Sequence, residues 1–211
     1  GIINAVNLID GVDGLAAGIG VTAISSLVVA LALAGEGPDL AFAGAFIGAL
    51  IGFLLFNFHP ASIFMGDSGS LFLGFVLATF SLPATQLTTD GLTFLVPVLA
   101  LGLPVMDTAT AITRRALQRR SIFSPDRDHI HHRLLSSMGQ AQRSTVCILY
   151  GMNTLFGLLA ILVLSVKSIA AMALILSVAA FFALFFLHRL GYPGIRAESA
   201  PLPKKQDNPN R

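Results

Sequence analysis

The sequence predicts an all-α fold, a polytopic membrane helix bundle with about six transmembrane helices and a short amphipathic cytoplasmic helix. Hydrophobic residues make up 55% of the 211 residues, charged residues make up 11%, and the mean hydropathy is +0.79. Soluble domains carry about 25% charged residues, whereas apolar runs of about 20 residues indicate membrane spans. A single cysteine, Cys147, excludes an internal disulfide.

Six apolar runs are candidates for crossing a bilayer at about 1.5 Å per residue. In chain order they are 15–34, 40–58, a run from 71 that ends between 83 and 90, 91–112, 145–164 and 169–187. Gly44, Gly48 and Gly52 recur every four residues in the second run, which predicts a face for close helix packing with a structural role. Pro97 and Pro104 predict a bend in the fourth run.

These runs define one membrane domain, 1–188, and the tail 189–211 is rich in Pro, Lys and Asn and is predicted to be disordered. All but one of the 13 Lys and Arg residues lie in the loop 114–143 or in the tail, and Lys167 falls on the opposite side. By the positive-inside rule the basic side is cytoplasmic. Residues 1–14, the loop around Asp67 and all five histidines fall on that same side.

A polar segment, 59–70, separates the second and third apolar runs. It contains Asp67, which is flanked by Gly66, Ser68 and Gly69. Small residues let the backbone approach a bulky ligand, and a carboxylate presented there can hold Mg²⁺ that shares its oxygen ligands with phosphate. The alternative is a tight turn in which Asp67 is the N-cap of the next helix.

The first 14 residues place two carboxamides and two carboxylates among apolar residues: Asn4, Asn7, Asp10 and Asp13. Acidic groups at a membrane surface suit a metal, a proton relay, or a phosphate-bearing substrate held through a metal. The alternative is a capped helix start in which Asp13 is the N-cap.

The stretch 124–135 predicts the short amphipathic helix. Ser124 suits an N-cap, Pro125 suits the first helical position, and Gly139 suits the C-terminal stop. Four apolar residues fall near one face: Ile130, Leu134, Leu135 and Met138.

This helix also carries a cluster of cationic and imidazole side chains: Arg127, His129, His131, His132 and Arg133. Arg matches phosphate oxygens with its planar fork, and His donates hydrogen bonds or carries charge, so the cluster predicts a diphosphate site. Zinc is an alternative because His129 and His132 share a helix face, although a third ligand must come from elsewhere.

Three stretches resemble the signatures of one family, and they occur in that family's order: NAVNLIDGVDGLAAG (4–18), NFHPASIFMGDSGSLFLG (57–74) and SPDRDHIHHRLL (124–135). The family is the polyprenyl-phosphate N-acetylhexosamine-1-phosphate transferases of glycosyltransferase family 4. The resemblance covers about residues 1–140. The HIHH and GDSGS forms are more similar to the UDP-GlcNAc branch than to the branch that acts on UDP-muramoyl-pentapeptide.

The resemblance implies transfer of a sugar 1-phosphate, GlcNAc-1-phosphate in this branch, from a UDP-sugar to undecaprenyl phosphate. The reaction releases UMP and begins a cell-envelope polysaccharide such as lipopolysaccharide or teichoic acid. It implies Mg²⁺, with Mn²⁺ as an alternative, a bacterial inner-membrane location with a cytoplasmic active site, no nucleic-acid partner and a possible homodimer. It matches Asp67 to the family's metal-binding Asp, Asn7, Asp10 and Asp13 to its nucleotide-sugar and catalytic loop, and His129, His131 and His132 to its histidine motif. Together with the residue patterns above, we expect metal binding by Asp67 and catalysis by Asp10, Asp13 and Asp67. The residues expected to bind substrate are Asn4, Asn7, Arg127, His129, His131, His132 and Arg133.

The sequence departs from the family in one respect, because it contains no adjacent Asp pair. Together with a start at Gly1 on a polar motif, this predicts the C-terminal part of a longer protein, and residues 1–211 alone are expected to be inactive. Two other classes stay open. Pro97 and Pro104 fit the broken helices of a secondary transporter, although there is no internal repeat and Asp107 lies near a span end. The third reading is a catalytically inert membrane assembly subunit.

Overall fold

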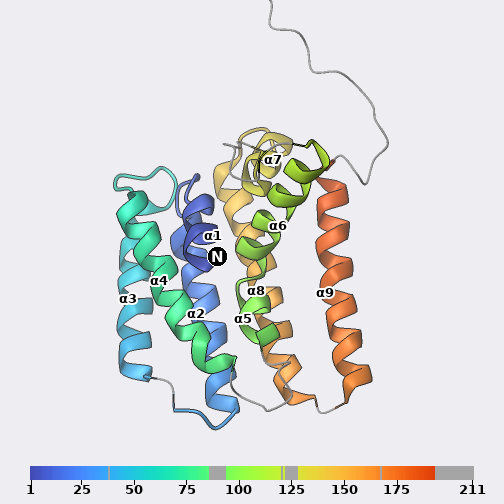
Figure 1. Ribbon diagram of the computed structural model, residues 1–211. Helices are drawn as coiled ribbons and strands as arrows, with labels where there is room; N and C mark the ends of the chain where they lie inside the picture. Colours follow the sequence, from blue (N-terminus) through green and yellow to red (C-terminus); the bar gives the residue numbers. More distant parts are fainter. Residues whose placement is uncertain (38, 86–93, 120, 122–127, 167, 193–211) are drawn as a thin grey trace, which may run out of the picture.

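The computed structural model describes residues 1–37, 39–85, 94–119, 121, 128–166 and 168–192, and every regular element in these ranges is an α-helix (Figure 1). The helices are α1 (Ile2–Ile9), α2 (Leu15–Leu33), α3 (Leu40–Asn57), α4 (Gly66–Ala84), α5 (Leu95–Ala100), α6 (Gly102–Leu117), α7 (Ile130–Ser137), α8 (Gln142–Ser165) and α9 (Ile169–Arg189). The predicted all-α class is confirmed.

Five of the described helices, α2, α3, α4, α8 and α9, are long and apolar enough to cross a membrane, where about six were expected. The difference arises in the apolar run 91–112. Helix α5 ends at Ala100 and α6 begins at Gly102, so the described part of this run is two short helices rather than one long one. Pro104 has no N–H to donate to the Ala100 carbonyl one turn earlier, and the predicted bend is therefore a break.

Helix α2 lies at the centre of the bundle, where it packs against α3, α4, α5 and α8 (Figure 1). Its side chains Leu15, Ile19, Ile24 and Leu27 are fully buried. A Cβ added at Gly18 of α2 would lie 2.0 Å from Cζ of Tyr150, so the contact between α2 and α8 requires glycine there.

The glycine stripe of α3 lies on the outer surface. No atom lies within 4 Å of a Cβ added at Gly44, Gly48 or Gly52. Helix α3 turns Ala43 and Leu50 toward the core instead. The close helix packing predicted for the glycine face is therefore absent within the described part of the chain.

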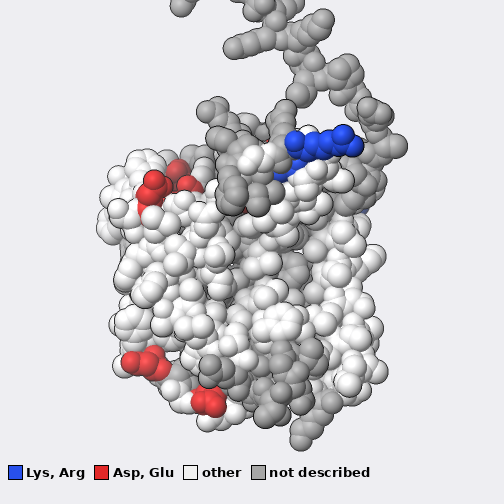
Figure 2. Space-filling view, viewed as in Figure 1, with Lys and Arg blue, Asp and Glu red and all other residues white. Residues whose placement is uncertain are grey.

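The three polar segments meet at one end of the bundle, as predicted. The turn between α1 and α2, the loop between α3 and α4, and helix α7 all lie there, while the turn between α2 and α3 lies at the other end (Figure 1). Helix α1 packs beside α4 and α6 and leads the chain to this end. Acidic side chains gather here above α3 and α4, and basic side chains lie near α6 and α9 (Figure 2).

Candidate active site

Asn7 joins α1 to the first turn of α4. Its Nδ2 donates to Asp67 Oδ1 at 3.3 Å and to Ser70 Oγ at 2.8 Å. The Ser70 hydroxyl donates onward to the Gly66 carbonyl at 3.0 Å. Asp67 lies in the first turn of α4, where the helix dipole favours a negative charge, but the N-cap is Met65. The alternative of Asp67 as the N-cap is therefore wrong.

Asp13 connects the turn after α1 to the loop after α3. Its Oδ2 lies 2.9 Å from His59 Nδ1 and accepts the Ala61 N–H at 3.1 Å. The N-cap of α2 is Gly14, with a positive φ of 80°, and no side chain caps this helix. Asp13 is therefore not an N-cap, and its carboxylate connects two loops of the candidate site.

Asn57, the last residue of α3, forms hydrogen bonds to the turn after α1 and to the loop after α3. Its Oδ1 accepts the Gly14 N–H at 3.0 Å, and its Nδ2 donates to the Ile63 carbonyl at 2.8 Å. Tyr150 of α8 donates its hydroxyl to the Gly14 carbonyl. Sequence reasoning did not single out Asn57 or His59, although both lie inside the recognised stretch 57–74. Both are polar residues at the junction of two apolar runs, and this pattern could have indicated a role in the site.

A hollow of about 280 Å³ opens between these loops, and its lining residues are Asp10, Gly11, Val12, Asp13, Asn57, Phe64, Met65 and Gly66. Burial, and then the negative charge of Asp67, raises the pKa of Asp10. Two carboxylates that repel each other beside a hollow form an environment that a cation stabilises.

The donor set fits Mg²⁺ better than zinc. Among the described residues, no three His, Cys, Asp or Glu side chains form a metal-binding group, so the zinc alternative finds no third ligand there. Mg²⁺ is usually held by one or two carboxylates, while waters and substrate phosphates complete its coordination. Asp10 and Asp67 match that requirement.

Helix α7 begins at Ile130, with His129 as its N-cap, and Ser124 and Pro125 lie outside the described residues. Its end follows the predicted pattern. Gly139 has a positive φ of 61°, and the Gln140 N–H donates to the Leu135 carbonyl at 2.9 Å, which closes the helix.

His131 brings α7 against the turn after α1. A Cβ at Gly11 would lie 2.7 Å from His131 Nε2, so the imidazole lies directly against the backbone of that turn. His131 is 3% exposed, and burial together with the neighbouring His132 lowers its pKa to about 4. It is therefore neutral near pH 7, and its Nε2 is buried without a hydrogen-bond partner. His132 is exposed, and burial and then His129 also lower its pKa.

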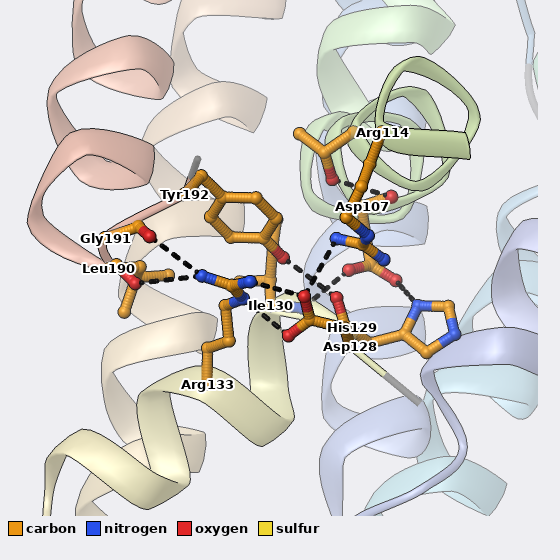
Figure 3. A network of polar contacts seen from close by, with 10 residues as sticks. Asp107, Arg114, Asp128, His129, Ile130, Arg133, Leu190, Gly191 and Tyr192 are labelled. Carbon is orange, nitrogen blue, oxygen red and sulfur yellow. Dashed lines mark hydrogen bonds and ion pairs between the residues drawn. The ribbon is translucent and has the colours of Figure 1, made fainter. Parts of the chain in front are cut away.

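Asp107 of α6 is a site residue that sequence reasoning placed only near a span end. Its side chain is 1% exposed. Oδ2 lies 2.7 Å from His129 Nδ1, and Oδ1 accepts the Ile130 N–H at 2.7 Å (Figure 3). A lone carboxylate in an apolar run was the available signal.

Arg133 belongs to a network of polar contacts at the end of α9 (Figure 3). It forms a bidentate pair with Asp128, donates to the Gly191 carbonyl at 3.0 Å and lies 4.1 Å from the centre of the Tyr192 ring. Its predicted role in substrate binding is not tested by this geometry. Asn4 is exposed one turn before Asn7, and Arg127 lies outside the described residues.

Membrane-spanning helices and a carboxylate- and histidine-bearing site at one end define a polytopic membrane protein with a polar site at the membrane surface. Residues 1–85 match the family described as glycosyl transferase family 4. The chain belongs to this family, as the resemblance of its three motifs predicted.

Curated relatives agree with that assignment. The chain is 42% identical over 165 residues to a probable undecaprenyl-phosphate N-acetylglucosaminyl 1-phosphate transferase of Bacillus subtilis, across 78% of the chain and 46% of the relative. It is 40% identical over 168 residues to decaprenyl-phosphate N-acetylglucosaminephosphotransferase of Mycobacterium tuberculosis, across 71% of the chain and 41% of the relative. It is 36% identical over 165 residues to phospho-N-acetylmuramoyl-pentapeptide-transferase of Halalkalibacterium halodurans, across 76% of the chain and 47% of the relative. The chain thus spans less than half the length of these relatives.

Proposed function

We propose that the natural protein transfers GlcNAc-1-phosphate from UDP-GlcNAc to a polyprenyl phosphate such as undecaprenyl phosphate, releases UMP, and thereby begins a cell-envelope polysaccharide. The observation that carries the proposal is the surface hollow lined by Asp10 and Asp13. Asp67 lies close enough for its charge to raise the pKa of Asp10, and His131 packs against Gly11 of the hollow's lining. The names of the B. subtilis and M. tuberculosis relatives support the acceptor class and the sugar.

In this mechanism the carboxylates serve mainly to hold Mg²⁺. Asp67, supported by Asn7, and Asp10 are the proposed ligands. When bound, Mg²⁺ supplies neutralisation of the charge on the phosphoryl oxygens. The attacking group is a lipid phosphate that is already an anion, so the mechanism needs no strong general base. Asp13 keeps the loop with His59 in place, and the neutral His131 packs its unpartnered Nε2 against Gly11, next to Asp10 in the chain.

The proposed location is the bacterial inner membrane, with this site on the cytoplasmic face. Described arginines lie at the site end of the bundle, near α6 and α9, and the turn between α2 and α3 at the other end carries Glu36 and Asp39. Cationic residues are retained on the cytoplasmic side of inner-membrane proteins, which supports this orientation. A cytoplasmic site also has direct access to a soluble nucleotide-sugar.

Exchange of radiolabelled UMP into UDP-GlcNAc tests the function, because the transfer is reversible and labelled UMP re-forms UDP-GlcNAc when it displaces the lipid phosphate from the lipid-diphosphate product. Membranes that contain the natural protein, undecaprenyl phosphate and Mg²⁺ should catalyse exchange, and EDTA should abolish it. UDP-GalNAc and UDP-muramoyl-pentapeptide are the alternative donors. No exchange with any of the three nucleotides would reject the proposal, and exchange with a different nucleotide alone would correct the donor.

A further inference from the structure

The geometry points to Asp107 as a positioning residue, which holds helix α7 and the ring of His129 so that His131 lies against the turn after α1. This inference rests on the proposed function, because the effect of positioning is measured as transfer. Asp107 lies outside the hollow and touches neither Asp10 nor Asp67 through any recorded hydrogen bond. It therefore acts through α7.

Both oxygens of the Asp107 carboxylate are directed to the start of α7. Oδ1 accepts the N–H of Ile130, the first residue of the helix, and so satisfies a backbone donor that has no partner inside the helix. A negative charge at this position also complements the helix dipole. The supporting carboxylate comes from α6, since no side chain of α7 or its N-cap residue forms a capping hydrogen bond.

The other oxygen sets the proton position on His129. An ionised carboxylate only accepts hydrogen bonds, so the 2.7 Å contact assigns the proton to Nδ1 of the imidazole. The partner of one ring nitrogen fixes the tautomer and the ring orientation of a functional histidine. The His129 ring is parallel to the His131 ring, at 5.7 Å between centroids and 3° between planes. The orientation of the His129 ring therefore constrains the orientation of the His131 ring.

The contact between His131 and Gly11 completes this connection. A Cβ at Gly11 would lie 2.7 Å from His131 Nε2, so a small movement of α7 changes the distance from His131 to the turn that bears Asp10. The Asp107 side chain is 1% exposed, so the surrounding residues hold it in place and it cannot shift together with α7. The carboxylate therefore fixes α7 in one position relative to the proposed donor site.

Asp107→Asn separates the two contacts. The amide oxygen still accepts the Ile130 N–H, whereas the amide NH₂ cannot accept the proton of His129 Nδ1. We expect kcat for UMP release to fall about 10–100-fold, by analogy with the loss of a partner that orients a metal-ligating histidine, with the KM for UDP-GlcNAc changed less than about twofold. Asp39→Asn is the matched control, because Asp39 is an exposed N-cap at the other end of α3 and Asn caps equally well.

A double-mutant cycle shows whether Asp107 acts through His129. In a His129→Ala background, Asp107→Asn should cause less than about a twofold further loss, since the shared contact is already gone. His129→Asn should retain more turnover than His129→Ala, because its amide NH₂ can replace the Nδ1–H donor. Wild-type kcat in Asp107→Asn, or an equal fold-loss in both backgrounds, overturns the inference.

A second readout does not depend on the proposed reaction. Spin labels at Ser62→Cys and Ser136→Cys, in a Cys147→Ala background, report the distance between the loop 58–65 and α7. Asp107→Ala should broaden this distance distribution and Asp107→Asn should leave it narrow. If the wild-type protein fails to exchange UMP, the proposed function fails while this measurement still decides the positioning role. An unchanged distribution in Asp107→Ala overturns it.

Discussion

Asn153 of α8 donates its side-chain amide to the Ala100 carbonyl at 3.2 Å, at the point where α5 ends. Its Oδ1 accepts the Leu103 N–H at 3.2 Å, and its Nδ2 also donates to Thr22 Oγ1 at 2.9 Å. Asn153 is fully buried. Within hydrocarbon no water replaces a missing helical hydrogen bond, so this side chain stabilises the break between α5 and α6.

Replacing Asn153 with Leu should therefore destabilise the protein strongly. The change keeps the number and branching of the side-chain heavy atoms but leaves the Ala100 carbonyl and the Leu103 N–H buried without partners, at a cost of about 1–3 kcal/mol each. Thermal unfolding in detergent measures the effect as a lowered midpoint. Ser177→Ala is the control, because Ser177 is exposed and bonds only within its own helix. Equal midpoints for Asn153→Leu and the wild type would contradict this account of the break.

Asp67→Asn should remove most transfer activity without unfolding the protein. The amide oxygen can still accept the bond from Asn7, while the charge proposed to bind Mg²⁺ is lost. Loss of one electrostatic transition-state contact of this kind costs roughly 3–4 kcal/mol, or about 10²–10³-fold in rate. Initial rates of UMP release at saturating Mg²⁺, beside the Asp39→Asn control, measure it. Turnover close to the wild type would assign Asp67 a structural role.

The hydrophobic pattern predicts the long helices well, and the reason is physical. A span of about 20 apolar residues in a membrane has few stable conformations other than a helix. The apolar run 15–34 therefore predicted α2, which is observed at Leu15–Leu33. The break at Leu101 depends on Asn153, about 50 residues away, and no local pattern indicates that partner.

In the candidate site too, local motifs predict some features, and others depend on residues far apart in the sequence. Motifs predicted which carboxylates and imidazoles gather at one membrane face, because each motif lies in a loop or at the end of a helix. Asp107 was missed because its partners, His129 and Ile130, lie more than 20 residues away in sequence. The surroundings of Arg133 were missed too, since its contact with Tyr192 depends on where α9 ends.

Arg133→Met should loosen the end of α9. The change removes the pair with Asp128, the bond to the Gly191 carbonyl and the stacking on Tyr192, which together contribute about 2–4 kcal/mol. Hydrogen exchange of the amides at 190–192 should become faster. Arg189→Met is the matched control, because Arg189 stacks only on Phe185 of its own helix. Unchanged exchange with a raised KM for the donor would instead support the predicted substrate-binding role of Arg133.

Cysteine labelling in intact cells tests the orientation. Single cysteines at Ser62, Ser136 and Gln140, in a Cys147→Ala background, should react with an impermeant maleimide only after lysis. Cysteines at Glu36 and Asp39 should react from outside, because they lie in the turn at the opposite end of the bundle. The positive-inside rule gives the direction of this result. Labelling of Ser136→Cys from outside would reverse the proposed orientation.

The burial of His131 predicts a specific acid sensitivity. Its pKa is about 4 in the folded protein and about 6.5 when solvated, so between these values only the unfolded chain gains a proton. The stability it contributes is complete above about pH 6.5 and falls as pH is lowered toward 4, by about 3 kcal/mol at 1.36 kcal/mol per pKa unit. His131→Asn cannot titrate, so its unfolding midpoint should decline less steeply than that of the wild type across this window. Asp10 and the other carboxylates are present in both proteins, and the difference between the two pH profiles isolates the imidazole. Parallel profiles would show that His131 is hydrated or protonated in the folded state.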